Sequence, residues 1–257
     1  MATKRQIDVV FIGVVRPKII RITLNSFKKK LLKNYNVRLI ANIDPSGETD
    51  KYSQEDIIGI CKEFFDNVVY RTPKEPSFSK AVKWGWEQVN SDIFFHLEDD
   101  WCLKRRVNIS KVEDAFKHKK IVSMRLNLTS NSKFQTTDFT YSDCLSLNPS
   151  FLRTAYIKEL IERFNNEKDP EKQFRESCAT KAYPNPKFIY YGEPTDSAIV
   201  IDTGKKWRKS NALTKWDLSN MKTVTWRHEN QKNRLKTLYY RIKYSAFIYY
   251  WSIRYCQ

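Results

Sequence analysis

Apolar runs and helix-like segments alternate along the first hundred residues. Short runs rich in β-branched and aromatic residues predict strands, and apolar residues at helical spacing between them predict helices. The predicted strands cover residues 7–15, 35–43, 67–70 and 93–97, and the predicted helices cover residues 18–32, 54–65 and 77–89. This alternation is typical of a parallel sheet with helices on its faces. We therefore predict an α/β fold with a Rossmann-like, mainly parallel sheet.

The second half has a less regular pattern. The predicted strands cover residues 121–128, 143–149, 187–191 and 197–201, and one predicted helix covers residues 150–164. Pro170-Glu171 predicts the start of a further helix, because proline and an acid both favour the first helical turn. An amphipathic helix is predicted over residues 229–257. No Pro/Gly/Ser-rich linker divides the 257 residues, so we expect a single domain.

Three consecutive carboxylates, Glu98, Asp99 and Asp100, follow the fourth predicted strand directly. Crowded carboxylates repel one another, and a divalent cation such as Mg²⁺ or Mn²⁺ removes that penalty. In an open α/β sheet, ligands bind beyond the carboxyl ends of the strands. In extended geometry Glu98 and Asp100 share one side and Asp99 takes the other. The run predicts a metal site with Asp99 turned toward the scaffold; a solvated acidic turn is the alternative.

Other common sites are disfavoured by the sequence. Gly13 lies inside the first predicted strand and no Gly-rich loop follows it, which argues against a dinucleotide site or a P-loop. The five cysteines are widely spaced without a C-x-x-C pair, and there are three histidines, so we do not expect a zinc site. We expect reduced thiols in a cytoplasmic protein.

The order of these features resembles the GT-A fold family of nucleotide-sugar-dependent glycosyltransferases. Asp44 follows the second strand, the segment 78–86 is similar to a helix that precedes the family's motif strand, and Glu98 to Asp100 stand where the family has its D-x-D motif. The ending Glu98 to Trp101 is also similar to small chlorella-virus and phage-encoded glycosyltransferases. The resemblance covers residues 6 to 101. Farther along, residues 202–207 resemble the D-x-G-x-x-W ending of the catalytic domain in related bacterial and viral transferases.

The resemblance implies a metal-dependent hexosyl- or pentosyltransferase. Its donor would be a UDP-sugar held with Mn²⁺ or Mg²⁺, and its acceptor a glycan or glycoprotein. Residues 1–103 would form the nucleotide-sugar-binding half and residues 104–228 the acceptor half, followed by the terminal helix.

Roles for single residues follow from the same resemblance. Asp44 would accept a hydrogen bond from uracil, and Glu98 one from the ribose or a metal-bound water. Asp100 and Glu98 would bind the metal, with His228 as a further ligand, although a lone histidine also suits a surface. The expected nucleotide-site residues, including cations near the diphosphate, are Arg16, Asp44, Arg71, Lys80, Glu98 and Asp99.

An inverting enzyme of this family needs a base in the acceptor half. Glu171 best matches the expected position, at the start of a predicted helix, and Asp169 is close by. Asp196 is a second candidate. The alternatives are that Glu171 caps the helix and that Asp196 is a turn residue. If the enzyme retains configuration, no protein base is required.

The net charge of +17 implies an anionic surface nearby. Residues 227–257 hold seven basic side chains against Glu229 alone, interleaved with Tyr and Trp. This mixture predicts an interfacial membrane helix. The alternative is that the helix packs on the domain through one apolar stripe. The residues of that stripe are Leu235, Leu238, Ile242, Ala246, Tyr249 and Ile253.

Two other classes of function stay open at this point. A two-metal nuclease could use Glu98 to Asp100, but it would need more acidic ligands, and only Asp44 is well placed. A non-catalytic basic protein could bind membranes or nucleic acid, although no nucleic-acid motif is present. No run approaches the ~20 apolar residues of a spanning helix.

Overall fold

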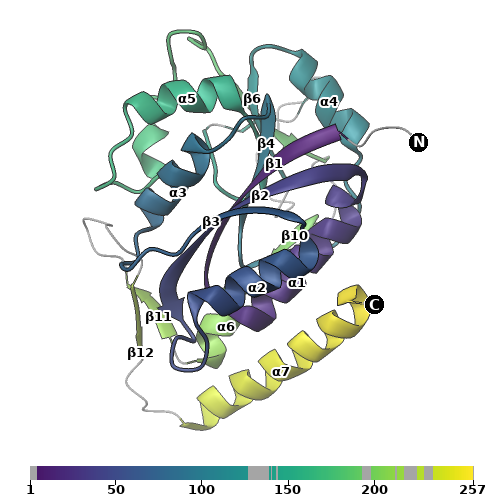
Figure 1. The fold of residues 1–257 in the computed structure, drawn as a ribbon, viewed down its shortest axis with the longest axis vertical. Coiled ribbons are helices and arrows are strands. Elements are labelled where there is room, and N and C mark those ends of the chain that lie inside the picture. The colour runs from purple at the N-terminus through teal and green to yellow at the C-terminus, as the bar shows by residue number, and fades with distance from the viewer. Residues whose placement is uncertain are drawn as a thin grey trace.

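The computed structural model describes residues 5–126, 139, 141–142, 144–192, 198–211, 213–216, 225–228 and 234–256. An eight-stranded sheet forms its centre, in the order β3-β2-β1-β4-β8-β6-β9-β7 (Figure 1). Every element predicted for the first half is present. These elements are β1 (Arg5–Val15), α1 (Pro17–Lys30), β2 (Tyr35–Gly47), α2 (Gln54–Phe64), β3 (Asn67–Arg71), α3 (Phe78–Glu87) and β4 (Ile93–Glu98).

The first four of these strands are parallel. β2 and β4 pair with opposite edges of β1, and β3 pairs with β2. The chain therefore winds one way from β1 to β3 and then crosses to the other side with β4. The crevice at such a reversal is where open α/β sheets bind ligands. In the register, Ile12 lies beside Glu98, so the end of β1 meets the acidic run.

The second half completes the sheet and adds two small antiparallel sheets of two strands each, β10-β5 and β11-β12. Its first elements are β5 (Trp101–Leu103), α4 (Ile109–Lys117), β6 (Ile121–Leu126), β7 (Tyr141–Ser142), β8 (Ser150–Arg153), α5 (Thr154–Glu162) and β9 (Lys187–Tyr191). The last elements are β10 (Val200–Asp202), α6 (Gly204–Ser210), β11 (Leu213–Trp216), β12 (Thr225–His228) and α7 (Arg234–Cys256). β8 runs antiparallel to both β4 and β6, while β6 and β9 are parallel.

Three predictions for this half are wrong. Residues 150–153 form a strand instead of the start of a helix, because Phe151 and Leu152 enter cores on opposite faces of the sheet. The strand predicted at 143–149 is absent from its described part, 144–149. Pro170-Glu171 opens a single turn of 3₁₀ helix, Lys172–Phe174, instead of a full helix.

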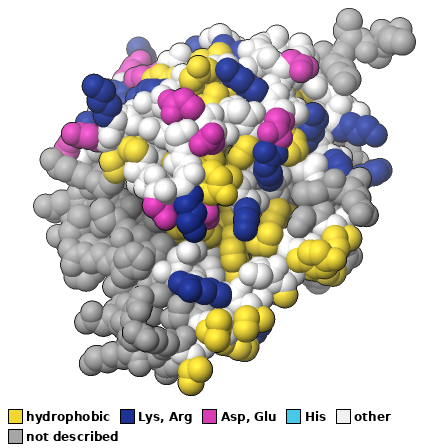
Figure 2. Space-filling view, turned by 60° about the horizontal axis from the view of Figure 1, so that its bottom comes forward, with side chains coloured by type: hydrophobic (Ala, Val, Ile, Leu, Met, Phe, Trp, Pro, Cys, Tyr) yellow, Lys and Arg dark blue, Asp and Glu magenta, His cyan; other side chains and the backbone are white. Residues whose placement is uncertain are grey.

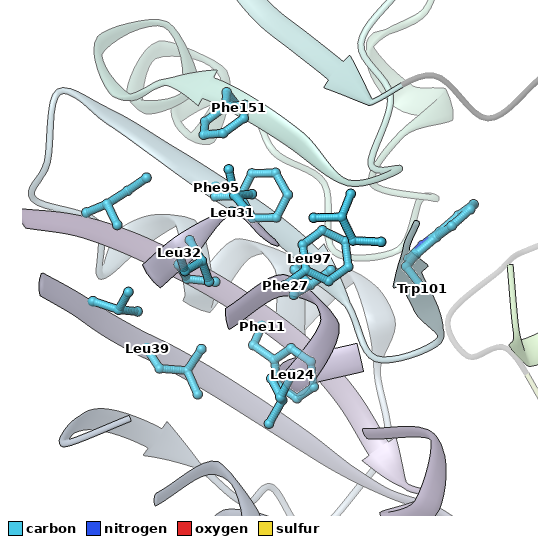
Figure 3. Close-up of a cluster of buried hydrophobic side chains, with 14 of the residues drawn as sticks. Phe11, Leu24, Phe27, Leu31, Leu32, Leu39, Phe95, Leu97, Trp101 and Phe151 are labelled. Atoms are coloured by element: carbon cyan, nitrogen blue, oxygen red, sulfur yellow. The ribbon is translucent and has the colours of Figure 1, made fainter. Parts of the chain in front are cut away.

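The core consists of two layers, one on each face of the sheet. Val9 and Phe11 of β1 face the layer under α1 and α2, whereas Val10 and Ile12 face the layer under α3 and α5. In the first layer Phe95 lies between Phe27 and Phe151, with ring centroids 5.6 and 4.8 Å away (Figure 3). The buried runs of β1 and β4 therefore match the near-continuous apolar pattern of a parallel sheet covered on both faces.

The C-terminal helix α7 packs against α1 and α6 (Figure 1). Trp251 is buried against Ile22 and Cys102, with Phe247 and Ile248 beside it. The apolar stripe that was expected to pack on the domain instead faces outward. Its residues Leu235, Leu238, Ile242, Ala246, Tyr249 and Ile253 are all exposed. Within the described residues, no helix is long and apolar enough to cross a membrane.

A buried carboxylate, Asp8, interrupts the apolar run of β1 and holds the amino end of the sheet together. It accepts from Arg38 Nε at 2.8 Å and Nη2 at 3.0 Å, and from the backbone N–H groups of Asn90 and Ser91. Burial disfavours its ionised form, but these hydrogen bonds outweigh burial and hold the pKa of Asp8 below its ordinary value.

Replacing Asp8 with alanine should lower the free energy of unfolding by ~3–5 kcal/mol near neutral pH, because Arg38 loses its buried partner. A carboxylate with a depressed pKa stabilises the fold above its unfolded-state pKa of ~3.9 and loses that contribution as the pH falls through the folded-state value. Urea unfolding of parent and D8A should therefore give stabilities that converge in acid. The exposed Asp50→Ala should change stability by less than ~0.5 kcal/mol. Similar losses in both variants would contradict this account.

Candidate functional site

The acidic run lies at the carboxyl ends of β1 and β4, at the point where the strand order reverses. β4 ends at Glu98 and β5 begins at Trp101, so Asp99 and Asp100 form the turn between them. The Asp99 N–H donates to the Ile12 carbonyl at 3.0 Å, which continues the pairing with β1 past the end of the strand. The turn therefore leaves the sheet in a defined direction.

Asp99 is locked to Arg16 inside the protein. The Arg16 Nε donates to Asp99 Oδ2 at 3.1 Å, and Nη2 contacts Oδ1. The Val14 N–H also donates to Oδ2, and the Thr23 hydroxyl donates to the Asp99 carbonyl at 2.7 Å. Asp99 and Arg16 are each 3% exposed. Asp99 thus faces the scaffold as predicted, which leaves its side chain little room to meet a nucleotide.

Burial strongly affects how the neighbouring carboxylates ionise. It raises the pKa of Asp99 to about 6, even though Arg16 favours the charged form. Burial, together with the charge of Asp100, raises the pKa of Glu98 to about 8. The Trp101 Nε1–H donates to Glu98 Oε2 at 3.0 Å and works in the opposite direction.

Asp100 is more accessible than Asp99. Its side chain is 17% exposed, and Oδ2 lies 3.3 Å from Arg16 Nη2. When all are ionised, three carboxylates stand around one guanidinium, which leaves two negative charges uncompensated within this group. Glu98 and Asp100 thus form a crowded anionic pair at the mouth of the crevice.

The start of α6 sets the position of Asp100. The backbone N–H and the hydroxyl of Thr203 both donate to the Asp100 carbonyl, each at 2.7 Å. A Cβ atom added to Gly204 would lie 1.9 Å from Asp100 Oδ2, so only glycine lets the carboxylate lie there. β10 brings this segment into place because Asp202 pairs with Trp101.

Trp207 supports Arg16 from the side opposite the carboxylates. The guanidinium carbon lies 5.1 Å from the centroid of the indole ring, and Trp207 Nε1–H donates to Glu48 at 2.9 Å. Tyr244 of α7 also lies near this group. Burial and the charge of Glu48 therefore raise the pKa of Tyr244, while the charge of Arg16 lowers it. The D-x-G-x-x-W segment was the sequence signal for Gly204 and Trp207; Glu48 and Tyr244 had none.

Asp44 lies at the end of β2 in a separate polar group. It is 6% exposed, and its two oxygens accept from Asn42 Nδ2 at 2.8 Å and from the Ser77 N–H at 2.9 Å. Arg71 Nε donates to Asn42 Oδ1 at 2.8 Å and its guanidinium stacks over Trp84. Burial raises the pKa of Asp44, and the bonds from Asn42 and Ser77 oppose that rise. Arg71 thus belongs to the same polar group as Asp44.

Glu171 comes close enough to the acidic run for its charge to raise the pKa of Glu98. It does not cap a helix: Asp169 accepts from the Glu171 and Lys172 N–H groups at 3.0 and 2.8 Å, and Glu171 pairs with Arg175 at 3.6 Å. Lys80 is exposed on the first turn of α3, whose Ser79 hydroxyl contacts the Lys168 carbonyl in the same loop region.

Two candidate residues cannot be placed in the site. Asp196 lies outside the described residues. His228 belongs to β12, where its backbone pairs with Leu213, but its side chain is not among those described. His96 is buried beneath Trp86 as a core residue, as expected.

The described residues contain no group of three or more His, Cys, Asp or Glu side chains that could hold a metal ion. The pair Glu98 and Asp100 still fits a hard cation, because Mg²⁺ sites commonly use one or two carboxylates together with substrate phosphates. A two-metal nuclease site fits poorly, because the described residues offer no group of three or more acidic ligands.

No protein-family model matches the sequence, and no curated protein matches it. Solved structures do resemble the fold. S. aureus TarS 1–349 has a TM-score of 0.51 at 13% identity, over 79% of this chain and 62% of that one. GalNAc-T7 has a TM-score of 0.51 at 10% identity, over 72% of this chain and 42% of that one. The Pyrobaculum calidifontis mannosyltransferase PcManGT has a TM-score of 0.54 at 7% identity, over 82% and 62%.

These similarities confirm the fold that the sequence predicted, a mixed α/β, mainly parallel sheet of the GT-A type. The chain spans about three fifths of the TarS fragment. Nothing in the comparisons supports the resemblance to chlorella-virus and phage enzymes.

Gly204→Ala should lower the free energy of unfolding by ~1–3 kcal/mol, because the added methyl group must displace Asp100 or α6. Gly59→Ala is the matched control: its Cβ would meet nothing within 4 Å, and it lies inside α2. Alanine there should leave stability unchanged or raise it by up to ~1 kcal/mol. Thermal unfolding of both variants is the measurement. Equal stability in both would show that Asp100 does not lie against Gly204.

Proposed function

We propose that the protein is a metal-dependent glycosyltransferase that moves a sugar from a nucleoside diphosphate sugar to a glycan or glycoprotein acceptor. One observation carries the proposal: Glu98 and Asp100 are crowded together at the strand-order reversal of a GT-A sheet, where the charge of Asp100 adds to burial in raising the pKa of Glu98. A pair of carboxylates in that crevice is suited to share a divalent cation with a diphosphate.

Two structural neighbours support the choice of ligands. GalNAc-T7 was crystallised with UDP, GalNAc and Mn²⁺, and PcManGT with GDP-Man and Mn²⁺. Both combine a nucleoside diphosphate with a divalent metal. They differ in the base, so the uridine preference proposed here rests on Asp44 and its resemblance to the family's base-binding aspartate.

Glu98 and Asp100 would hold Mn²⁺ or Mg²⁺, with His228 as a further ligand. When bound, the cation would stabilise the negative charge that develops on the leaving diphosphate. Arg16 acts indirectly, because it is 3% exposed and bound to Asp99 and Asp100; it orients the carboxylates. Arg71 and Lys80 remain as cations that can contact the donor, Arg71 beside Asp44 and Lys80 at the surface of α3.

Glu171 is the proposed base for an inverting reaction. Its closeness to Glu98 supports this role, and its i,i+4 pair with Arg175, at 3.6 Å, is partly exposed. In this role it would take the proton of the acceptor hydroxyl as the sugar bond forms. Asp196 is the second candidate for the same role. In a retaining reaction both residues would be structural.

Asp100→Ala should abolish Mn²⁺-dependent UDP binding while the fold persists. The residue lies in the turn after β4, and its loss leaves Arg16 its stronger partner, Asp99. Calorimetry of UDP with and without Mn²⁺ measures the effect, and Asp114→Ala, which removes an exposed carboxylate of α4, is the control. Unchanged UDP affinity in D100A would remove Asp100 from the metal site.

Asp44→Asn should weaken UDP binding by ~1–3 kcal/mol, because the amide presents a donor where uracil N3 also donates. The same amide can donate to N3 of cytosine, so the ratio of UDP to CDP affinity should fall. This ratio separates base recognition from any loss of stability caused by the bonds to Asn42 and Ser77. If the ratio stays constant, Asp44 only ties β2 to α3 and the uridine assignment is wrong.

A further inference from the structure

The outward face of α7 is the most apolar exposed surface among the described residues. Nine large hydrophobic side chains are exposed among the described residues. Seven of them belong to α7, and the other two are Tyr52 and Tyr70. The seven are Leu235, Leu238, Tyr239, Ile242, Tyr249, Tyr250 and Ile253, which are 43 to 80% exposed. Steps of three, four and seven residues place them along one side of the helix.

This outward stripe is distinct from the face that anchors the helix. Trp251 is 7% exposed and packs with Phe247 and Ile248 against the domain. Lys206 of α6 lies 3.8 Å above the Phe247 ring, and Arg241 Nε donates to the Ser210 carbonyl at 3.3 Å. α7 therefore has an anchored side and an uncovered apolar side.

Basic residues border the outward stripe. Arg241 and Lys243 are both exposed, and each stands about 100° around the helix from Ile242, on either side. α6 adds the exposed Lys205, Lys206 and Lys209 beside the helix, with Lys206 over Phe247 and Lys209 over Tyr240 on the anchored side. Residues 203–216 and 230–257 contain no Asp or Glu. Figure 2 shows groups of hydrophobic side chains along the lower part of this face, with Lys and Arg side chains beside them.

The geometry points to an anionic lipid surface as the partner of the outward stripe. An interfacial helix buries an apolar face ~5–10 Å into the head-group boundary and keeps its cations on anionic lipid, with tyrosines at head-group depth. A second copy of the chain would bring two sets of like charges together. Nucleic acid would meet the basic border but leave the aliphatic stripe exposed to water. Only the anionic bilayer complements both parts of the surface.

Docking through the outward stripe fixes where the candidate site lies. α6 packs against α7 and begins at Gly204, directly against Asp100. α6 is therefore in contact with both α7 and the acidic run, so docking of α7 on lipid would bring the candidate site close to the bilayer. This inference does not depend on the reaction that the site performs.

Co-sedimentation of the full chain with vesicles tests the inference. The vesicles are phosphatidylcholine with ~30% phosphatidylserine, compared with phosphatidylcholine alone, at low and high salt. The test variant is the triple substitution Leu235→Ser, Ile242→Ser and Tyr249→Ser, all on the outward stripe. Its matched control is Tyr52→Ser with Tyr70→Ser, which removes exposed rings elsewhere. A second pair compares Lys243→Glu with Lys111→Glu on α4, far from α7 (Figure 1).

The parent should bind the anionic vesicles, bind the neutral ones less, and be released as salt rises. The triple variant should bind at least ~10-fold more weakly. Lys243→Glu changes the charge by two units. It should weaken vesicle binding ~5-fold for each unit, relative to Lys111→Glu. Unchanged melting temperatures keep loss of folding apart from loss of binding. The inference is overturned if the parent stays in the supernatant, if the test variants sediment like their controls, or if gel filtration shows a dimer that the triple variant dissociates.

Discussion

The buried ion pair between Arg16 and Asp99 organises the carboxyl end of this sheet. A charged pair with both members 3% exposed is stable only when each charge has its partner and its hydrogen bonds. Arg16 follows β1 and Asp99 follows β4, so the pair ties together the two strands at the reversal point. Trp207 then covers the guanidinium, which draws α6 onto the same spot.

The arrangement gives the three adjacent carboxylates different surroundings. Asp99 is buried in the turn after β4 and pairs with Arg16, whereas Asp100 is partly exposed. Burial, together with the charge of Asp100, raises the pKa of Glu98 to about 8. A site of this kind is poised for a cation, because the cation relieves a repulsion that the scaffold enforces. Thr203 and Gly204 complete the site by holding Asp100 in place.

α7 shows how one helix can serve two environments. Its inner residues Phe247 and Trp251 belong to a small core with α1, and its outer residues stay uncovered. Aromatic residues occur on both sides, which is why the apolar pattern of the sequence pointed to the wrong packing face. The close approach of Tyr244 to Glu48 and Arg16 links this helix to the crevice.

The sequence by itself determined the first four strands, the helices between them and the inward orientation of Asp99 within the acidic run. These features depend on local spacing, which an extended or helical chain converts directly into faces. Spacing also predicted His96 as a core residue. Arg16 binds Asp99, which lies 83 residues away in the sequence, and Asp8 binds Ser91, which is equally distant. No local sequence pattern reveals partners at such a separation.

The tertiary structure decided the rest. Ser150–Arg153 became a strand because β4 and β6 offered paired edges on both sides, against a helical pattern. Asp169, not Glu171, accepts from the free N–H groups of the turn, because its side chain lies 2.8 to 3.0 Å from them. The exposed face of α7 was settled by which side chains fitted against α1 and α6. In each case long-range packing chose among options that the local sequence left equally open.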